Sequence, residues 1–334
     1  MEILAKPWNG LLIAALADGP ARFSELLERL NSIGDRMLSE RLKDLQRAGL
    51  VQRHVLPGPP VRVEYELTAA GHGFREVYDA IGRWRTINTV KVGAAFESIL
   101  IRGLMAFIMG LPNNSPEFRY ALHEMTEECN HIQMFQELVN RSGADVPGMS
   151  PLFRRMAPFI GLVGHISPSA FMAGILAGEE PIDHFQKALI REGADIPPAV
   201  LRTMQIHIAE EARHISWANE FLKTHWSQRS WRFRAFATVA FPVLLRYLAF
   251  EIMTPQKKAF MAEFDIPQSV FREAFWRGPR ARQIMAGYFP EMRALAGELG
   301  LMNRVGRRIW KLCRIDGDAA RYRSAPDREA IAIS

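Results

Sequence analysis

Two segments of the chain repeat glutamate and histidine at a spacing that suits metal binding. Glu128 and His131 lie three positions apart, and Glu211 and His214 repeat this Glu-x-x-His pattern. Side chains at i and i+3 of an α-helix project from one face, so each pair can reach one ion. His207, four positions before Glu211, falls on the same face as the second pair. Carboxylates and imidazoles together are a ligand set that suits iron.

A further glutamate precedes each motif in an otherwise apolar stretch. Glu97 lies 31 positions before Glu128, and Glu180 lies 31 positions before Glu211. Equal offsets predict a duplicated helical hairpin closing around one centre, which is the ligand arrangement of ferritin-like di-iron carboxylate bundles. The offset favours Glu180 over its neighbour Glu179.

The residues around these motifs receive weaker assignments. Glu179, Glu210 and Arg213 are expected to face solvent or to surround the ligands, and Asp183 or His184 to orient a ligand imidazole. Glu124 holds the position in the first motif that His207 holds in the second, so the repeat is not symmetrical there. A single Glu-x-x-His is usually a solvated helix face. Two such motifs with matched upstream glutamates favour a metal site.

The elements that must position these residues are helices. Beyond residue 90 the apolar residues recur with helical periodicity, and four long helices are expected, consistent with a bundle. Ser115-Pro116-Glu117 is a good cap and first turn for the second of them. Pro181 directly follows Glu180 and predicts a kink or a bulge within the third helix.

The motif segments "EECNHIQMF" and "HIAEEARHISWANEFL" resemble the p-aminobenzoate N-oxygenase family of non-haem di-iron proteins. The resemblance covers roughly residues 90–250, and its most specific mark is the extra histidine in H-x-x-x-E-x-x-H. It implies two iron ions, with a manganese–iron pair left open, and O2 as co-substrate. The ligands that it implies are Glu97, Glu128, His131, Glu180, His207, Glu211 and His214.

The same resemblance implies an oxygenase that transfers oxygen to the nitrogen of an amine, with arylamines as candidate small-molecule substrates. The sequence shows neither a dinucleotide-binding glycine fingerprint nor a cysteine-rich cluster motif. We therefore expect an external electron donor, such as a separate reductase. Two alternatives stay open: a non-catalytic regulator whose helical domain senses metal, oxygen or a small molecule, and, with less support, metal storage.

The first 88 residues indicate a different order of helices and strands. Two helices separated by Gly19-Pro20 are expected within residues 8–30, and a third begins near Asp35 with an apolar stripe of leucines. The segment "LVQRHVLPGPPVRVEYELT" alternates on both sides of a Pro/Gly turn, which predicts a β-hairpin. Three helices followed by a hairpin is the order of a winged helix-turn-helix.

The segments "GPARFSELLERL", "MLSERLKDLQRAGLVQR" and "PPVRVEYELTAAGH" resemble the HxlR-type winged-helix regulators over almost all of residues 6–85. The resemblance implies a dimeric DNA-binding module whose third helix enters the major groove. It leaves open a domain kept only for dimerisation or for binding a partner. The expected DNA contacts are Arg36, Ser39, Arg41 and Lys43 at the third helix, and Arg53, His54 and Arg62 beside the wing.

The whole chain is therefore expected to be mainly α-helical. We predict a winged helix-turn-helix at 1–88, a ferritin-like oxygenase domain at 89–317 and a flexible tail at 318–334, with a stiff helical junction near residues 86–90. The two cysteines among 334 residues cannot form a disulfide framework. No stretch reads as a secretory signal or a complete membrane span. We expect a cytoplasmic homodimer without stable membrane insertion.

Overall fold

The computed structural model describes residues 6, 8–30, 33–191 and 196–320. They divide into two compact units. One contains the described residues up to Trp84 together with Phe264–Arg277, and the other contains Arg85–Glu263 and the described residues from Gly278 onward. The expected boundary at residue 88 and the expected homodimer stay predictions. From residue 321 onward the expected flexible tail lies outside the described residues.

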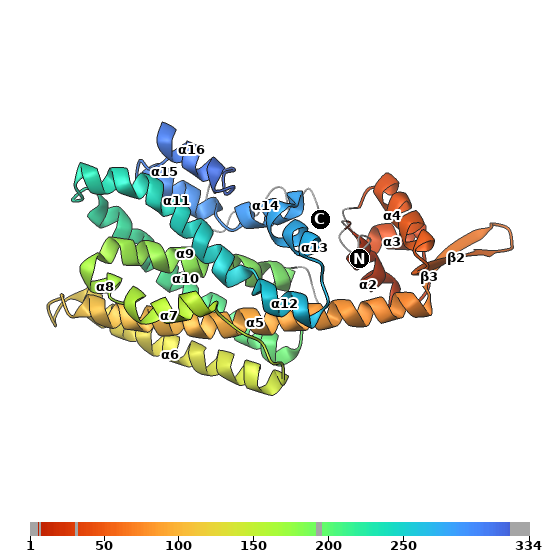
Figure 1. The fold of residues 1–334 in the computed structure, drawn as a ribbon, viewed down its shortest axis with the longest axis horizontal. Helices are drawn as coiled ribbons and strands as arrows, with labels where there is room; N and C mark the ends of the chain where they lie inside the picture. The colour runs from red at the N-terminus through yellow and green to blue at the C-terminus, as the bar shows by residue number, and fades with distance from the viewer. Residues whose placement is uncertain (1–5, 7, 31–32, 192–195, 321–334) are drawn as a thin grey trace. The chain divides into compact units, whose positions relative to one another are not determined.

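The first unit is a winged helix, as the sequence predicted (Figure 1). Its helices and strands are α2 (Asn9–Leu16), β1 (Ala21–Arg22), α3 (Phe23–Arg29), α4 (Asp35–Arg47), β2 (Val51–Leu56) and β3 (Arg62–Leu67). The three strands form an antiparallel sheet in the order β1-β3-β2, and the hairpin register pairs Val51 with Leu67 and Leu56 with Arg62. The two-residue strand β1 is not predicted from the sequence, because a strand that short has no readable alternation.

Leucines spaced by one helical turn build the core of this unit. Leu38, Leu42 and Leu45 project from one face of α4 and are fully or almost fully buried. Burying each of them contributes roughly 1.5–3 kcal/mol relative to leaving it in water. The chain turns after α4 at Gly49, whose φ of 70° is accessible to glycine at little cost. Short α13 (Gln268–Arg272) and the π-helix η1 (Glu273–Arg277) also belong to this unit.

A single helix, α5 (Ala69–Ile108), covers the junction that the sequence predicted to be helical. Its residues from Arg85 onward belong to the second unit. That unit is all-helical in its described residues and continues with α6 (Pro116–Ser142), α7 (Pro151–Ile160), α8 (Val163–Ile166), α9 (Pro168–Arg191), α10 (Pro198–Trp226), α11 (Trp231–Met253), α12 (Lys257–Glu263), α14 (Pro279–Gly287), α15 (Pro290–Glu298) and α16 (Arg304–Leu312).

Helix α6 begins at the cap that the sequence predicted. The Ser115 hydroxyl accepts a hydrogen bond from the Phe118 amide at 3.1 Å and caps α6, and Gly143, with φ of 64°, ends it. Helix α9 stays α-helical across Pro181, so the expected bulge is not formed. One α-helix therefore carries Glu179 and Glu180 through this position.

The four helices that carry the motif residues are neighbours in the bundle: α10 packs against α6 and α9, and α5 contacts α6 and α9 (Figure 1). Helix α11 packs against α9, and α16 packs against α11. By length and composition alone, one described segment, Trp231–Glu263, is long and apolar enough to cross a membrane. Helix α11 nevertheless buries Phe241, Leu245 and Ala249 in the bundle core. The absence of stable membrane insertion therefore stays our prediction.

Candidate metal centre

Eight side chains from four helices converge in the interior of the bundle, and each of them has an exposed fraction of 0%. Helix α5 supplies one, α6 three, α9 one and α10 three: Glu97; Glu124, Glu128 and His131; Glu179; and His207, Glu211 and His214. We call these eight residues the cluster. They fall into four overlapping triplets in which the possible ligand atoms lie within 4.8 Å of one another.

Glu128 and Glu211 occupy the middle of the cluster, between two imidazoles. The Nδ1 atom of His131 lies 2.8 Å from Glu128 and 3.3 Å from Glu211. The Nδ1 atom of His214 lies 2.8 Å from Glu128 and 3.3 Å from Glu211 as well. Each central carboxylate therefore faces both rings and would be able to bind a cation together with either imidazole.

The opposite nitrogens of these two histidines are held by a second pair of carboxylates. His131 Nε2 lies 2.8 Å from Glu210, and His214 Nε2 lies 2.8 Å from Glu127. Arg213 also donates to Glu127. The contacts are reciprocal, because α10 supports the histidine of α6 and α6 supports the histidine of α10. An Nε2–H donated outward leaves the Nδ1 lone pair directed at the centre.

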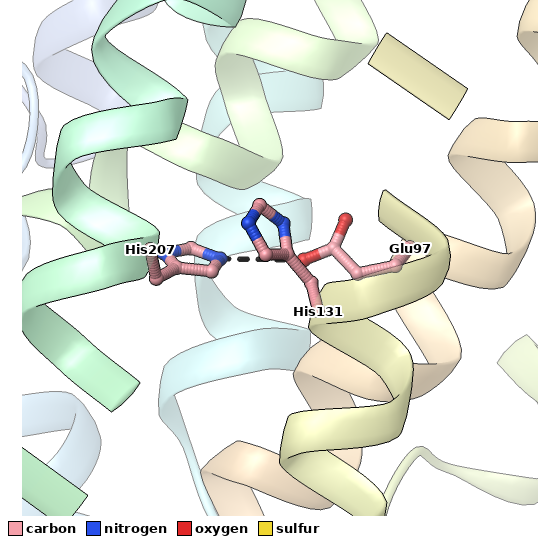
Figure 2. A group of neighbouring side chains, drawn as sticks. All are labelled: Glu97, His131 and His207. Carbon is pink, nitrogen blue, oxygen red and sulfur yellow. Dashed lines mark ion pairs between the residues drawn. The ribbon is translucent and has the colours of Figure 1, made fainter. Parts of the chain in front are cut away.

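His207 lies beside Glu97 and Glu211 in the cluster. Its Nε2 atom lies 3.5 Å from Glu97 and 3.7 Å from Glu211. Figure 2 shows Glu97, His131 and His207 pointing toward one another from three helices. The Nδ1 atom of His207 lies 3.2 Å from the Gln186 side-chain oxygen, so Gln186 orients this ring. The candidates expected for that task, Asp183 and His184, pair instead with Lys187 and Glu291.

The structure brings Glu179 rather than Glu180 into the cluster, and the ligand role of Glu180 stays a prediction. Glu179 lies with His207 and Glu211, whereas Glu180 lies with His184 and Glu291 outside the cluster. Equal sequence offsets cannot distinguish neighbouring residues when the rotation of α9 is set by packing. Gly178 is buried against the Phe96 ring, where any side chain would overlap it. This contact places the next residue, Glu179, toward the centre.

Two further contributors, Glu124 and Glu127, are not predicted from the sequence, whereas Glu210 supports a ligand imidazole, one of the two placements expected for it. Glu124 joins Glu128 and His214, although its position was recognised as the counterpart of His207. Glu127 and Glu210 each immediately precede a motif glutamate, so the full repeat is Glu-Glu-x-x-His. That doubled glutamate is the signal that identifies the supporting carboxylates.

Several polar atoms of the cluster have no hydrogen-bond partner among the described residues. Both carboxylate oxygens of Glu97, Glu124, Glu179 and Glu211 are buried without a hydrogen-bond donor, and so is His207 Nε2. Buried polar groups are almost always satisfied, because leaving one unpaired costs about 1–3 kcal/mol or more. Two divalent cations would satisfy these atoms at once. The donors are carboxylates and imidazoles with no thiolate, which fits iron or manganese better than a structural zinc site.

The electrostatics of the cluster lead to the same conclusion. Burial, reinforced by Glu128, Glu179 and Glu211, raises the pKa of Glu97 well above its ordinary range. Burial also raises the pKa of Glu179 and raises that of Glu124 to about 8. Burial opposes charge on His131, but the nearby carboxylates of Glu128 and Glu211 prevail and raise its pKa to about 10. Without cations, the cluster must hold protons to offset its negative charge.

A small cavity of about 30 Å³ adjoins the cluster. Phe135 and Gln186 form part of its wall, and both contact His207, the first with its ring 5.1 Å from the imidazole and the second through the hydrogen bond described above. This volume suits a molecule of the size of water or O2.

The expected DNA contacts in the first unit are not equally available. Arg36, Lys43, Arg53 and Arg62 are exposed, and Ser39 and His54 are partly buried. Arg41 differs, because its side chain is only 13% exposed and forms ion pairs with Glu40 and Asp44. His54 lies 3.1 Å from Glu66 on the neighbouring strand. The structure thus assigns Arg41 a contact within the domain.

Two family models match the chain. The model described as P-aminobenzoate N-oxygenase AurF matches residues 75–300, and the HxlR-like helix-turn-helix model matches residues 3–91. The uncharacterized protein Rv0885 of Mycobacterium tuberculosis is 50% identical over 260 residues, which are 78% of this chain and 76% of that protein. The HTH-type transcriptional regulator YodB of Bacillus subtilis is 45% identical over 83 residues, which are 25% of this chain and 74% of YodB.

Among solved structures, the reduced form of YodB matches with 44% identity and a TM-score of 0.24, covering 25% of this chain and 81% of that one. The AurF model covers more than half of the chain and includes every cluster residue, and the HxlR-like model covers the winged helix. The chain belongs to the P-aminobenzoate N-oxygenase AurF family and carries an HxlR-like helix-turn-helix domain in the same polypeptide.

Proposed function

We propose that the cluster holds two iron ions and that the helical unit is an O2-dependent oxygenase acting on the nitrogen of an amine. The observation that carries the proposal is the set of buried carboxylates without donors, on Glu97, Glu124, Glu179 and Glu211. Unpaired carboxylates destabilise an apolar core, whereas two divalent cations would bind them and offset their charge. The choice of iron, O2 and an amine rests on the family of the chain.

A pair of iron ions bound here would supply the redox chemistry that O2 activation needs. The residues of the chain have separable tasks around it. Glu128 and Glu211, which lie between His131 and His214, would hold the ions together with these imidazoles. Glu127, Glu210 and Gln186 each contact one ring nitrogen of an imidazole and orient that ring. Complete burial of the eight residues excludes bulk water from the cluster.

The remaining components lie outside the chain. N-oxygenation consumes electrons, which we assign to a separate reductase, and arylamines are the substrates suggested by the family. The HxlR-like unit would bind DNA through the exposed basic side chains of α4 and the wing, in a cytoplasmic setting.

The proposal is tested by loading the full chain with Fe(II) without oxygen and measuring iron per chain. We expect about two irons in the wild type and a large loss in the double variant His131→Ala with His214→Ala. His225→Ala is the matched control, because His225 lies on the same helix as His214 but bonds the Phe221 carbonyl oxygen. Wild-type protein that stays iron-free would contradict the proposal.

A second experiment separates oxygenase from sensor. The iron-loaded chain is given O2, a reductant and an arylamine, and the product is measured by mass spectrometry. An N-oxygenated product that disappears in the double histidine variant supports catalysis. The HxlR-like domain is the observation that favours a regulator. Ligand-dependent release of DNA without any product would support the regulator and contradict the oxygenase.

A further inference from the structure

The helical unit contains a second, much larger cavity that no cluster residue lines. Its volume is about 410 Å³, and its walls come mainly from α5, α9 and α11. Aromatic and aliphatic side chains dominate the lining, and among the described lining residues none carries a formal charge. A volume of this order is typical of sites for small molecules.

Polar groups in the lining are few. Trp226 donates its indole N–H to the Leu299 carbonyl oxygen at 2.7 Å, so that group is satisfied. Tyr247 lies at the rim, with 46% of its surface exposed. Ser169 is different, because it is only 3% exposed and its Oγ has no hydrogen-bond partner. A buried hydroxyl without a partner costs free energy unless something else binds it.

We propose that this cavity binds a neutral, largely apolar molecule that carries one hydrogen-bonding group, which meets the Ser169 hydroxyl. An engineered apolar cavity of about 150 Å³ holds benzene. By that measure, 410 Å³ accommodates a ligand of two or three rings, or an alkyl-substituted ring. A carboxylate or an ammonium group finds no counter-charge among the described lining residues and would lose its hydration on entry.

The cavity opens to the surface along α11. Phe236, which is 68% exposed, and Tyr247 both line it, so the lining continues from the interior to solvent. Exposed aromatic side chains at the entrance of an apolar cavity favour capture of apolar molecules from water. Access therefore does not require unfolding of the bundle.

One wall of the cavity is shared with the helices that carry the cluster. Phe96 lines the cavity and directly precedes Glu97, and its ring packs against Gly178, which directly precedes Glu179. A ligand in the cavity would therefore contact the ring that lies between two cluster-bearing helices. The ligand site itself does not depend on the proposed oxygenase chemistry, because none of its residues belongs to the cluster.

Calorimetric titration of the full chain tests the proposal with three probes that share one alkyl chain: 4-pentylphenol, pentylbenzene and 4-pentylbenzoate. We expect 4-pentylphenol to bind at one site and to bind at least about tenfold more tightly than the charged 4-pentylbenzoate. The same result is expected with and without iron, so failure of this proposal is distinguishable from failure of the oxygenase. Equal or tighter binding of the benzoate would overturn the neutral-ligand assignment.

The decisive variant is Gly174→Leu, because Gly174 lines the cavity and a Cβ added there meets open space. The new side chain should fill the cavity and weaken 4-pentylphenol binding by at least about tenfold. Gly297→Leu is the matched control, since Gly297 is also helical and unobstructed but lies outside the cavity lining. Unchanged binding in Gly174→Leu, with Gly297→Leu equally unaffected, would overturn the proposal.

Ser169→Ala tests the hydrogen bond with a change too small to threaten folding. It should weaken 4-pentylphenol several-fold and leave pentylbenzene unchanged, because only the phenol can pair with the hydroxyl. Equal effects on both probes, or no effect on either, would overturn the assignment of Ser169.

Discussion

In the two central histidines, His131 and His214, both ring nitrogens are engaged by carboxylates. In each, Nδ1 faces Glu128 and Glu211. The Nε2 atom faces a glutamate from the other of the two helices α6 and α10. Burial alone would raise the pKa of Glu127, but the hydrogen bond from His214 and the charge of Arg213 outweigh it and lower that pKa. Glu127 therefore stays ionised and fixes the His214 ring.

The choice between Glu179 and Glu180 can be tested directly at the residue scale. Glu179→Gln should weaken Fe(II) binding by about 10–100-fold, because it removes a carboxylate from the centre of the cluster. Glu180→Gln should leave the affinity within about twofold, since this side chain lies with His184 and Glu291. Iron titration of both variants decides between them, and the reverse order of effects would restore the assignment made from sequence offsets.

Metal loading should also release protons. The pKa of Glu124 is raised to about 8, and those of Glu97 and Glu179 are raised as well, with burial as the main cause for each. At a pH below its pKa, each carboxyl holds a proton that a cation must displace. The apparent Fe(II) affinity should therefore rise with pH between about 6 and 8.

Calorimetry in buffers of different ionisation enthalpy measures the number of protons released. Glu124→Gln should release about one proton fewer near pH 7, because it removes the group with a pKa of about 8. An affinity that does not change with pH would contradict this account of the cluster.

At the scale of elements, glycines let the helices around the cluster approach closely. Gly164 in α8 faces the carbonyl oxygen of Gly103 in α5, and Gly178 in α9 faces the Phe96 ring. A Cβ at either position would overlap its neighbour. These contacts set the distance and the rotation of the helices, and thereby decide which side chains point at the centre.

Gly164→Ala should therefore destabilise the helical unit by about 1–3 kcal/mol, because the backbone of α5 must shift to relieve the overlap. Gly174→Ala is the matched control, with no atom within 4 Å of the added Cβ. It should be neutral or stabilising by up to about 1 kcal/mol through helix propensity. Urea unfolding followed by circular dichroism measures both variants, and equal stabilities would show that α8 is free to move away.

At the scale of the whole molecule, the chain combines two kinds of site on separate units. The cluster lies within the second unit, and the exposed basic residues of α4 and of the β2–β3 wing lie within the first. Their functions can therefore be removed one at a time.

The double variant Arg53→Ala with Arg62→Ala should weaken DNA binding and lower the slope of log affinity against log salt by roughly 2, because each arginine would neutralise one phosphate. Its iron content should match that of the wild type. Arg141→Ala is the control, because Arg141 is exposed but pairs with Glu137 on α6 in the other unit. An unchanged salt slope measured by fluorescence anisotropy would exclude the wing from binding DNA.

The fold class can be predicted from the amino-acid sequence, and so can the two helical motifs that supply most of the cluster. Helical periodicity and spacing are local properties, so Glu128 with His131 and Glu211 with His214 could be placed on common faces before any packing was known. The leucine stripe of α4 and the alternation of the wing identified the winged helix for the same reason.

Which of the two adjacent glutamates faces the centre depends on how the helices pack. Neighbouring residues on a helix point about 100° apart, and the packing of Gly178 against Phe96 sets the rotation of α9. The same holds for the partners of the imidazoles, because Glu127, Glu210 and Gln186 reach them from other helices. The apolar cavity likewise exists only between packed helices, since its walls come from segments far apart in the chain.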